Sequence, residues 1–141
     1  MLNQLVIYGA PMAKPRMTRK DQFLTKLRTF RTERDARRAE MLQRYFDWCN
    51  GVRAQAGLRG KLVLTRGVRI SVYVFLGMPM SWSQKERTAM VGAPHLVKPD
   101  ADNFLKGLCD ALFENDQMIY HKRIEKRWDD GRGPRMEVSV W

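Results

Sequence analysis

The most informative stretch of this 141-residue sequence reads KPDADNFLKGLCDALF and covers residues 98–113. Its apolar residues recur at intervals of three and four, which predicts an amphipathic helix over about residues 102–113. The side chains expected to be buried are Phe104, Leu105, Leu108, Cys109 and Leu112. Helical geometry places Asp102, Lys106 and Asp110 together in one polar strip. The stretch therefore predicts a helix that packs with one face and exposes charged groups on the other.

The rest of the sequence predicts a mixture of strands and helices. Strands are expected over residues 2–8, 61–77, 117–128 and 134–141, and the second of these could instead form a hairpin around Arg66 and Gly67. Helices are expected over about residues 33–48, after a capping signal at Thr32, and from Gln84 to before Gly92, after a capping box that starts at Ser83. This order predicts an α+β fold, with a mixed sheet and helices packed on it. Because no repeat or low-complexity linker is visible, we expect one domain over residues 1–141.

The charge of the chain is unevenly distributed. The formal net charge is +11, from 26 Lys and Arg against 15 Asp and Glu. Residues 14–44 hold 11 basic and 4 acidic residues, whereas residues 98–141 hold 8 basic and 9 acidic ones. A basic first half suits a polyanion such as DNA. Carboxylates would repel DNA phosphates, so an acidic cluster in such a protein points to a divalent cation between them.

Several classes of protein are excluded by the composition. The longest apolar stretch, around residues 72–78, is far too short to cross a bilayer, and the first residues do not have the pattern of a signal peptide. Neither Cys49 nor Cys109 has a second cysteine at metal spacing, which excludes a zinc module. We therefore expect neither a membrane protein nor a disulfide scaffold, and two lone thiols indicate the cytoplasm.

Two carboxylates lie at the start of the predicted helix. In extended chain, the two-residue spacing of Asp100 and Asp102 points both side chains the same way, and hard oxygen ligands of this kind suit Mg²⁺. Two simpler interpretations stay open. Asp102 could be an N-cap, and Lys106 could form an exposed ion pair at i, i+4 with Asp110 or with Asp102.

The motif resembles the RusA family of Holliday junction resolvases. The resemblance rests on residues 98–106, on Asp110-Ala111-Leu112 and on an acidic residue before Gln117, with support from residues 14–18, Ser81-Trp82-Ser83 and His95. It implies a phage-type, Mg²⁺-dependent endodeoxyribonuclease, with Mn²⁺ as a possible substitute. The family acts in DNA recombination and repair, as an intertwined or closely paired homodimer that resolves four-way DNA junctions by paired symmetric nicks.

The resemblance also implies roles for individual residues. Asp100, Asp102 and Asp116 correspond to metal-binding aspartates, and Lys106 to an essential lysine. The chain departs from the family pattern by having Glu114-Asn115-Asp116 where a pair of aspartates is usual, so Glu114 stays possible as the third carboxylate. A helix of about 11 residues is ~16 Å long, which separates Asp116 from Asp100. Either the chain doubles back or, as we slightly favour, the partner subunit supplies the third carboxylate.

Basic and aromatic residues complete the predicted site. Phosphate contacts are expected from the loop residues Lys14, Arg16, Arg19 and Lys20, and from the helix residues Arg34, Arg37 and Arg38. Trp82 or Trp128 could stack on an unpaired base, although core packing is the simpler role for both. His95 could contact DNA or the reacting groups, but a single histidine is more often structural. Two alternatives to a resolvase stay open: a non-catalytic dimer that binds branched DNA, and a flap or single-strand nuclease that uses the same carboxylates.

Overall fold

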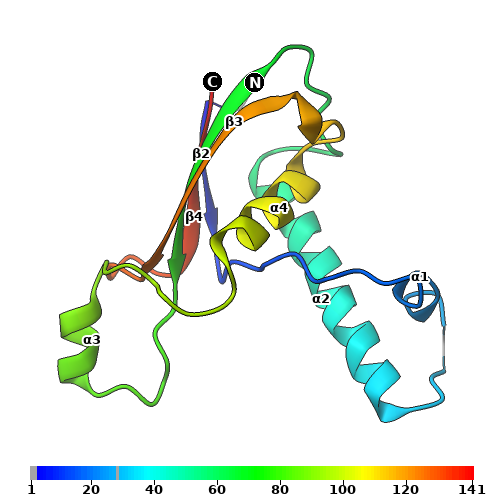
Figure 1. Ribbon diagram of the computed structural model, residues 1–141, viewed down its shortest axis with the longest axis horizontal. Helices are drawn as coiled ribbons and strands as arrows, with labels where there is room; N and C mark the ends of the chain where they lie inside the picture. The colour runs from blue at the N-terminus through cyan, green and yellow to red at the C-terminus, as the bar shows by residue number, and fades with distance from the viewer. Residues whose placement is uncertain (1–2, 28) are drawn as a thin grey trace.

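The computed structural model describes residues 3–27 and 29–141, and its centre is a four-stranded mixed sheet (Figure 1). The strand order is β1-β4-β2-β3, formed by β1 (Gln4–Tyr8), β4 (Arg135–Val140), β2 (Val68–Leu76) and β3 (Ile119–Trp128). Strand β4 is antiparallel to both β1 and β2, whereas β2 and β3 are parallel. The predicted α+β fold with a mixed sheet is confirmed. Leu2, which was included in the first predicted strand, lies outside the described residues.

The helices extend the molecule away from this sheet. They are α1 (Asp21–Leu24), α2 (Glu33–Gln55), α3 (Gln84–Met90) and α4 (Ala101–Leu112), with a short 3₁₀ turn, η1, over Asp116–Met118. The parallel connection from β2 to β3 contains α3 and α4, as parallel pairing requires a long crossover. Figure 1 shows α4 lying between the sheet and α2, while α3 and the α1 end of α2 form two separate lobes. The 3₁₀ turn and α1 were not predicted from the sequence.

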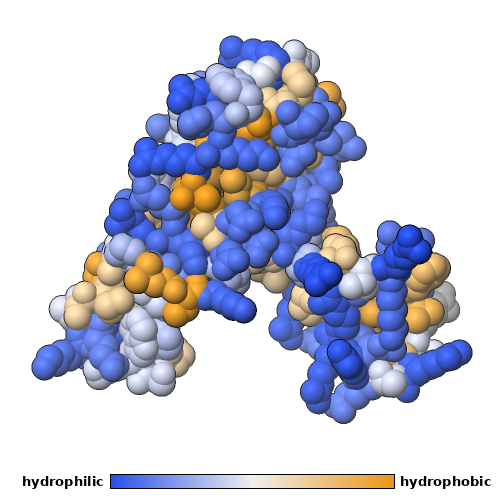
Figure 2. Space-filling view, in the orientation of Figure 1, coloured by the Kyte–Doolittle hydropathy of each residue, from blue (hydrophilic) through white to orange (hydrophobic). Residues whose placement is uncertain are grey.

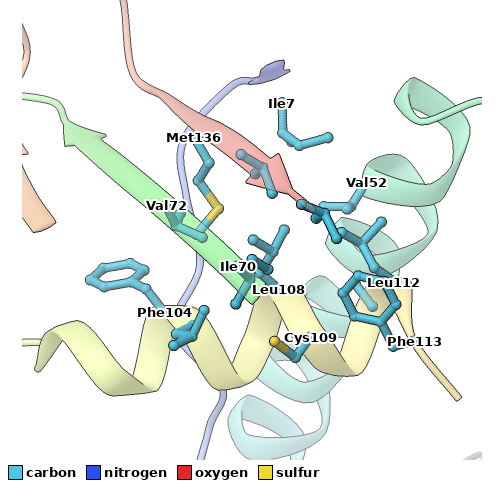
Figure 3. Packing of buried hydrophobic residues seen from close by; sticks show 14 of the residues in the cluster. Ile7, Val52, Ile70, Val72, Phe104, Leu108, Cys109, Leu112, Phe113 and Met136 are labelled. Atoms are coloured by element: carbon cyan, nitrogen blue, oxygen red, sulfur yellow. The ribbon is translucent and has the colours of Figure 1, made fainter. Parts of the chain in front are cut away.

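The hydrophobic core lies between the sheet and the helices α2 and α4 (Figure 3). Alternate residues of β2, namely Val68, Ile70, Val72 and Val74, are buried, as expected for a strand with one covered face. The apolar face of α4 meets them, and its buried residues are Phe104, Leu105, Gly107, Leu108, Cys109, Ala111 and Leu112. All five side chains that the sequence predicted to be buried on this helix are therefore buried.

Helix starts follow the predicted capping signals, but α2 is longer than predicted. The Thr32 hydroxyl accepts a hydrogen bond from the backbone N–H of Asp35 at 3.2 Å, and Ser83 and Glu86 form a complete capping box. Helix α2 ends at Gln55 rather than near residue 48, because Val52 continues its buried stripe. The Gln55 amide then bonds the backbone N–H and C=O of Tyr8, at 2.7 and 2.9 Å.

Only the second half of the strand predicted over residues 61–77 is a strand, and no hairpin forms around Gly67. The first half of this segment lies against the end of α4 instead. Leu62 donates to the Leu112 carbonyl at 2.7 Å and accepts from the Glu114 N–H at 2.8 Å. The Asn115 side chain bonds both backbone groups of Leu64, at 2.7 and 2.8 Å. These contacts satisfy the polar backbone that a hairpin would otherwise pair.

Two further expectations concern the class of protein. None of the helices in the described ranges is both long enough and apolar enough to span a membrane. Cys49 and Cys109 are both buried and free. Burial raises the pKa of both thiols, that of Cys109 to about 11, so both sulfur atoms behave as core side chains rather than as reactive groups.

Candidate functional site

Asp100 and Asp102 lie at the start of α4. Asp100 occupies the N-cap position with extended backbone, but its side chain makes no capping hydrogen bond. No ion pair or hydrogen bond involves the Asp100 carboxylate within residues 3–27 and 29–141. Asp102 lies in the first turn, so the interpretation of Asp102 as the N-cap was wrong. Both carboxylates are exposed, and the positive end of the helix dipole favours negative charge there.

The loop that leads into α4 is fixed by the edge strand of the sheet. Lys126 of β3 donates from Nζ to the carbonyl oxygens of Val97 and Pro99, at 2.6 and 2.7 Å. The second of these carbonyls immediately precedes Asp100. The position of Asp100 is therefore set by the sheet as well as by its own helix.

Lys106 pairs with Asp102 and not with Asp110. Its Nζ lies 3.1 Å from Asp102 Oδ2, and the two side chains are 63% and 62% exposed. The predicted polar strip on α4 is therefore divided. The first turns carry Asp102 and Lys106 in solvent, whereas Asp110 is half-buried further along the helix.

Asp110 contacts two residues from distant parts of the sequence. Its Oδ2 accepts a hydrogen bond from the Tyr45 hydroxyl at 2.9 Å, and its Oδ1 lies 3.3 Å from Lys14 Nζ. The interpretation of Lys106 with Asp110 as an ion pair was therefore wrong. Neither Tyr45 nor the link to Lys14 was identified from the sequence, because nothing local in the sequence indicates contacts over 65 and 96 residues.

The candidates for a third carboxylate follow the end of α4. Glu114 and Asp116 are both exposed, and Asn115 between them holds the turn through its bonds to Leu64. The 12 residues of α4 separate this turn from Asp100, a length of ~18 Å. Within the described ranges, no group of three or more His, Cys, Asp or Glu side chains could hold a metal ion. One chain therefore places Asp100 and Asp102 at the start of α4 and Asp116 beyond its other end. Because Asp102 is helical, the expectation that an extended chain points both carboxylates the same way does not apply.

Six of the seven predicted phosphate-binding residues lie around α1 and the start of α2, and the seventh, Lys14, lies against α4. Arg16, Lys20, Arg34, Arg37 and Arg38 all line one pocket of about 890 Å³. Three of these cations form ion pairs: Lys20 Nζ lies 2.8 Å from Asp35, Arg37 lies 2.7 Å from Glu33, and Arg38 lies 2.8 Å from Asp21. Arg19 is exposed on the preceding loop. The structure thus gathers the basic loop and the basic helix on one lobe.

Arg38 has a structural contact that the sequence did not indicate. Its Nε and Nη2 donate to the two carboxylate oxygens of Asp21, at 3.0 and 2.8 Å, and Nη2 also donates to the Arg16 carbonyl. Asp21 is only 3% exposed. Its hydrogen bonds with Arg38 hold the pKa of the Asp21 carboxyl well below its usual range. Arg38 therefore fastens the basic loop to α2.

His95 and the two tryptophans form an aromatic cluster. The ring centroids of His95 and Trp128 are 4.2 Å apart, and those of Trp82 and Trp128 are 4.7 Å apart. His95 is 7% exposed, and its Nδ1 has no hydrogen-bond partner in the described part of the chain. Burial, together with the charge of Lys126, lowers the pKa of His95. This cluster packs the connection that contains α3 against the end of β3, which is the structural role that the sequence also allowed.

These features define a basic α+β protein with two exposed carboxylates at the start of one helix and a cationic lobe beside it. The chain belongs to the RusA endodeoxyribonuclease family, which matches residues 9–141. The family resemblance of the sequence motif is thereby confirmed. The chain is also similar to the uncharacterized protein YqaN of Bacillus subtilis (strain 168), with 29% identity over 90 residues, or 58% of this chain. The matched part spans 62% of the length of that relative.

Proposed function

We propose that this chain is a structure-specific endodeoxyribonuclease that resolves four-way DNA junctions by paired symmetric nicks as a homodimer. The observation that carries the proposal is the exposed pair Asp100 and Asp102 beside Lys106 in a chain of the RusA family. Two opposed cuts at a four-way junction suit a two-fold symmetric dimer.

The donor set fits a hard divalent cation. Asp100 and Asp102 supply carboxylate oxygens, and one or two carboxylates plus waters are a usual protein environment for Mg²⁺. We infer that these residues would hold Mg²⁺, or Mn²⁺, together with Asp116 of the partner subunit. Glu114 is the alternative third ligand. When bound, such an ion supplies Lewis acidity to a phosphodiester and favours deprotonation of a water.

The protein groups have separate tasks in the proposed hydrolysis. A water oxygen attacks phosphorus, the bond from phosphorus to the leaving sugar oxygen breaks, and a proton passes to that oxygen. Lys106 would stabilise the extra negative charge that develops on the phosphoryl oxygens, because its ammonium group already lies beside Asp102. Asp102 in turn keeps the Lys106 side chain at the start of α4.

The shape and charge of the molecule support a DNA substrate. Figure 2 shows a hollow between the lobe of α3 and the lobe of α1 and α2, with mostly hydrophilic surface on the second lobe. The chain that leads into α4 lies above this hollow in Figure 1. Cationic side chains on one lobe would bind backbone phosphates without regard to sequence. The carboxylates at the start of α4 would then meet the strand that crosses the hollow.

The test uses a synthetic four-way junction incubated with and without Mg²⁺ or Mn²⁺. We expect the wild type to make symmetric nicks only with the metal, and Asp102→Asn to bind the junction without nicking it. Asp47→Asn is the matched control, since Asp47 is an exposed carboxylate on α2 that accepts a hydrogen bond from Gln43. Tight binding without nicks by the wild type under either metal would instead identify a DNA-binding module. Preferential cutting of flap or single-stranded competitors would identify a different nuclease.

A further inference from the structure

A small cationic pocket lies beside the start of α4, next to the larger pocket of the α1 lobe, and Arg16 lines both pockets. Its volume is about 400 Å³, and it is lined by Lys14, Pro15, Arg16, Asn103 and Lys106. Two of these residues come from α4, and the other three come from the chain between β1 and α1. The pocket adjoins the proposed catalytic carboxylates, because Lys106 also pairs with Asp102.

The N-terminal segment is held closely against α4 at this point. The backbone N–H of Lys14 donates to the Asn103 carbonyl at 3.0 Å. A Cβ atom on Gly107 would lie 3.1 Å from the Met12 carbonyl oxygen and 3.2 Å from the Lys14 nitrogen. Glycine at this position therefore allows the two backbones to approach, so the position of Lys14 relative to α4 is fixed by the backbone itself.

The side chain of Lys14 is fixed as well. Asp110 holds its ammonium group at 3.3 Å, and the same carboxylate accepts the Tyr45 hydroxyl at 2.9 Å. Tyr45 is fully buried and its ring stacks on Trp48, with centroids 6.2 Å apart. Each Asp110 oxygen thus has a partner. The buried Tyr45 orients the carboxylate, and the carboxylate orients the Lys14 ammonium group.

The charges of the pocket favour a singly charged anion. Lys14 and Lys106 are each paired with one carboxylate, whereas the Arg16 guanidinium has no partner in the described ranges of the chain. The pocket therefore has one uncompensated positive charge and several N–H donors. A phosphodiester carries one negative charge, and its oxygens only accept hydrogen bonds. It therefore matches a pocket with one positive charge and several N–H donors.

We propose that Lys14, Arg16 and Asn103 bind a backbone phosphate of DNA next to the phosphate that is cut, which Lys106 faces, and that Asp110, supported by Tyr45, is a positioning residue for Lys14. The proposal rests on the proposed nuclease function, since it makes this pocket the element that sets the position of the strand relative to Asp102. Asp110 is then neither a metal ligand nor a catalytic residue.

The pocket is tested by binding of the full chain to a synthetic four-way junction in EDTA over a series of salt concentrations. The slope of log K against log [salt] is negative, and each lost phosphate contact reduces its magnitude by about 0.9 per chain. We expect Lys14→Met to reduce the magnitude of the slope by about this amount and Lys14→Arg to keep the wild-type slope. Lys85→Met, an exposed lysine on α3, is the matched control and leaves the slope unchanged. An unchanged slope for Lys14→Met would overturn the pocket.

The role of Asp110 is tested by a double-mutant cycle of Asp110→Asn and Lys14→Met, with thermal unfolding as a check on folding. If Asp110 acts through Lys14, Asp110→Asn weakens junction affinity several-fold in the wild-type background and has no effect in the Lys14→Met background. Tighter binding in both backgrounds would show that Asp110 acts only as a negative charge. No effect in the wild type, or equal losses in both backgrounds, would also contradict a positioning role.

The two proposals can fail separately. A wild type that binds junctions but cuts no DNA under Mg²⁺ or Mn²⁺ would contradict the nuclease function, while the salt slopes would still judge the pocket. A wild type that cuts normally, with a Lys14→Met variant of unchanged slope, would contradict the pocket alone.

Discussion

Asp100 and Asp116 lie at opposite ends of α4, with the 12 residues of that helix between them. The helix alone is ~18 Å long, more than two carboxylates that share one cation can span, so we expect a site that uses both to take them from two chains. This separation gives a specific expectation for mixed dimers.

We predict that a heterodimer of an Asp100→Asn chain and an Asp116→Asn chain is active at one of its two sites. If each site combines Asp100 of one chain with Asp116 of the other, both substitutions fall in the same site, and the second site is intact. The heterodimer, purified through two different tags, should nick junctions on one strand without completing paired cuts. Both homodimeric variants should be inactive.

If one chain supplied all three carboxylates, each site of the heterodimer would carry one substitution and no nicks would form. A heterodimer of a Glu114→Gln chain and an Asp100→Asn chain is the matched control for the identity of the third ligand. One active site in the Asp116 mixture is expected whether or not Glu114 contributes. Full activity of homodimeric Glu114→Gln would assign the third position to Asp116, and its loss would reverse that assignment.

Gly107 and Gly51 are both helical glycines, but they have different surroundings. We predict that Gly107→Ala destabilises the protein by about 1–3 kcal/mol, the usual cost of overpacking, because the added Cβ would lie 3.1 Å from the Met12 carbonyl oxygen. Gly51→Ala in α2 meets nothing within 4 Å and should stabilise the protein by about 0.5–1 kcal/mol. Urea unfolding of both variants measures the difference. Equal changes for the two would show that residues 12–14 do not pack on α4.

The sequence was sufficient to predict most helices and strands, and it was least informative where distant contacts decide the local structure. The apolar pattern of α4 predicted its bounds to within one residue and five of its seven buried residues. The end of α2 depends in addition on Gln55, which bonds Tyr8 47 residues away. Residues 61–67 have strand-forming composition, but Leu64 finds its backbone partner in the side chain of Asn115, 51 residues later.

The same reasoning explains which parts of the candidate site could be predicted. Asp100, Asp102 and Lys106 are close in sequence, so their spacing alone predicts that they lie together. The partners of Asp110 are Tyr45 and Lys14, on α2 and on the N-terminal segment, which only the tertiary packing brings together. Gly107 was the available signal, because glycine in a helix interior costs about 1 kcal/mol and so indicates a close approach.

Two arginines of α2 differ in their expected roles: Arg38 has a structural role, and Arg34 is expected to bind DNA alone. Arg38 donates two hydrogen bonds to the buried Asp21 carboxylate, whereas Arg34 is exposed on the same helix. We predict that Arg38→Met lowers both the melting temperature and junction affinity, because it leaves a buried carboxylate unpaired. Arg34→Met should lower affinity alone. Thermal unfolding and junction binding check both variants, and an unchanged melting temperature for Arg38→Met would show that the pair with Asp21 does not hold the loop.

Because His95 is buried, we expect the free energy of unfolding to decrease in mild acid. Its folded-state pKa lies below the ordinary value of 6.5, chiefly through burial, so the unfolded chain takes up a proton at a higher pH than the folded one. Stability is therefore full above about pH 6.5 and falls as the pH decreases from there towards the folded-state pKa. The carboxyls of Asp21 and Asp130 also have pKa values lowered by arginine partners. Their protonation decreases stability only below about pH 4.

We predict that His95→Phe removes the decrease in unfolding free energy between about pH 7 and pH 5, because phenylalanine keeps the aromatic contact with Trp128 and cannot be protonated. His121→Phe is the matched control, since His121 is exposed on β3, and it should keep the pH dependence of the wild type. Urea unfolding at several pH values measures this. A wild-type unfolding free energy that is constant over this range, or one that rises on acidification, would mean that the folded His95 ring accepts a proton as readily as the unfolded one.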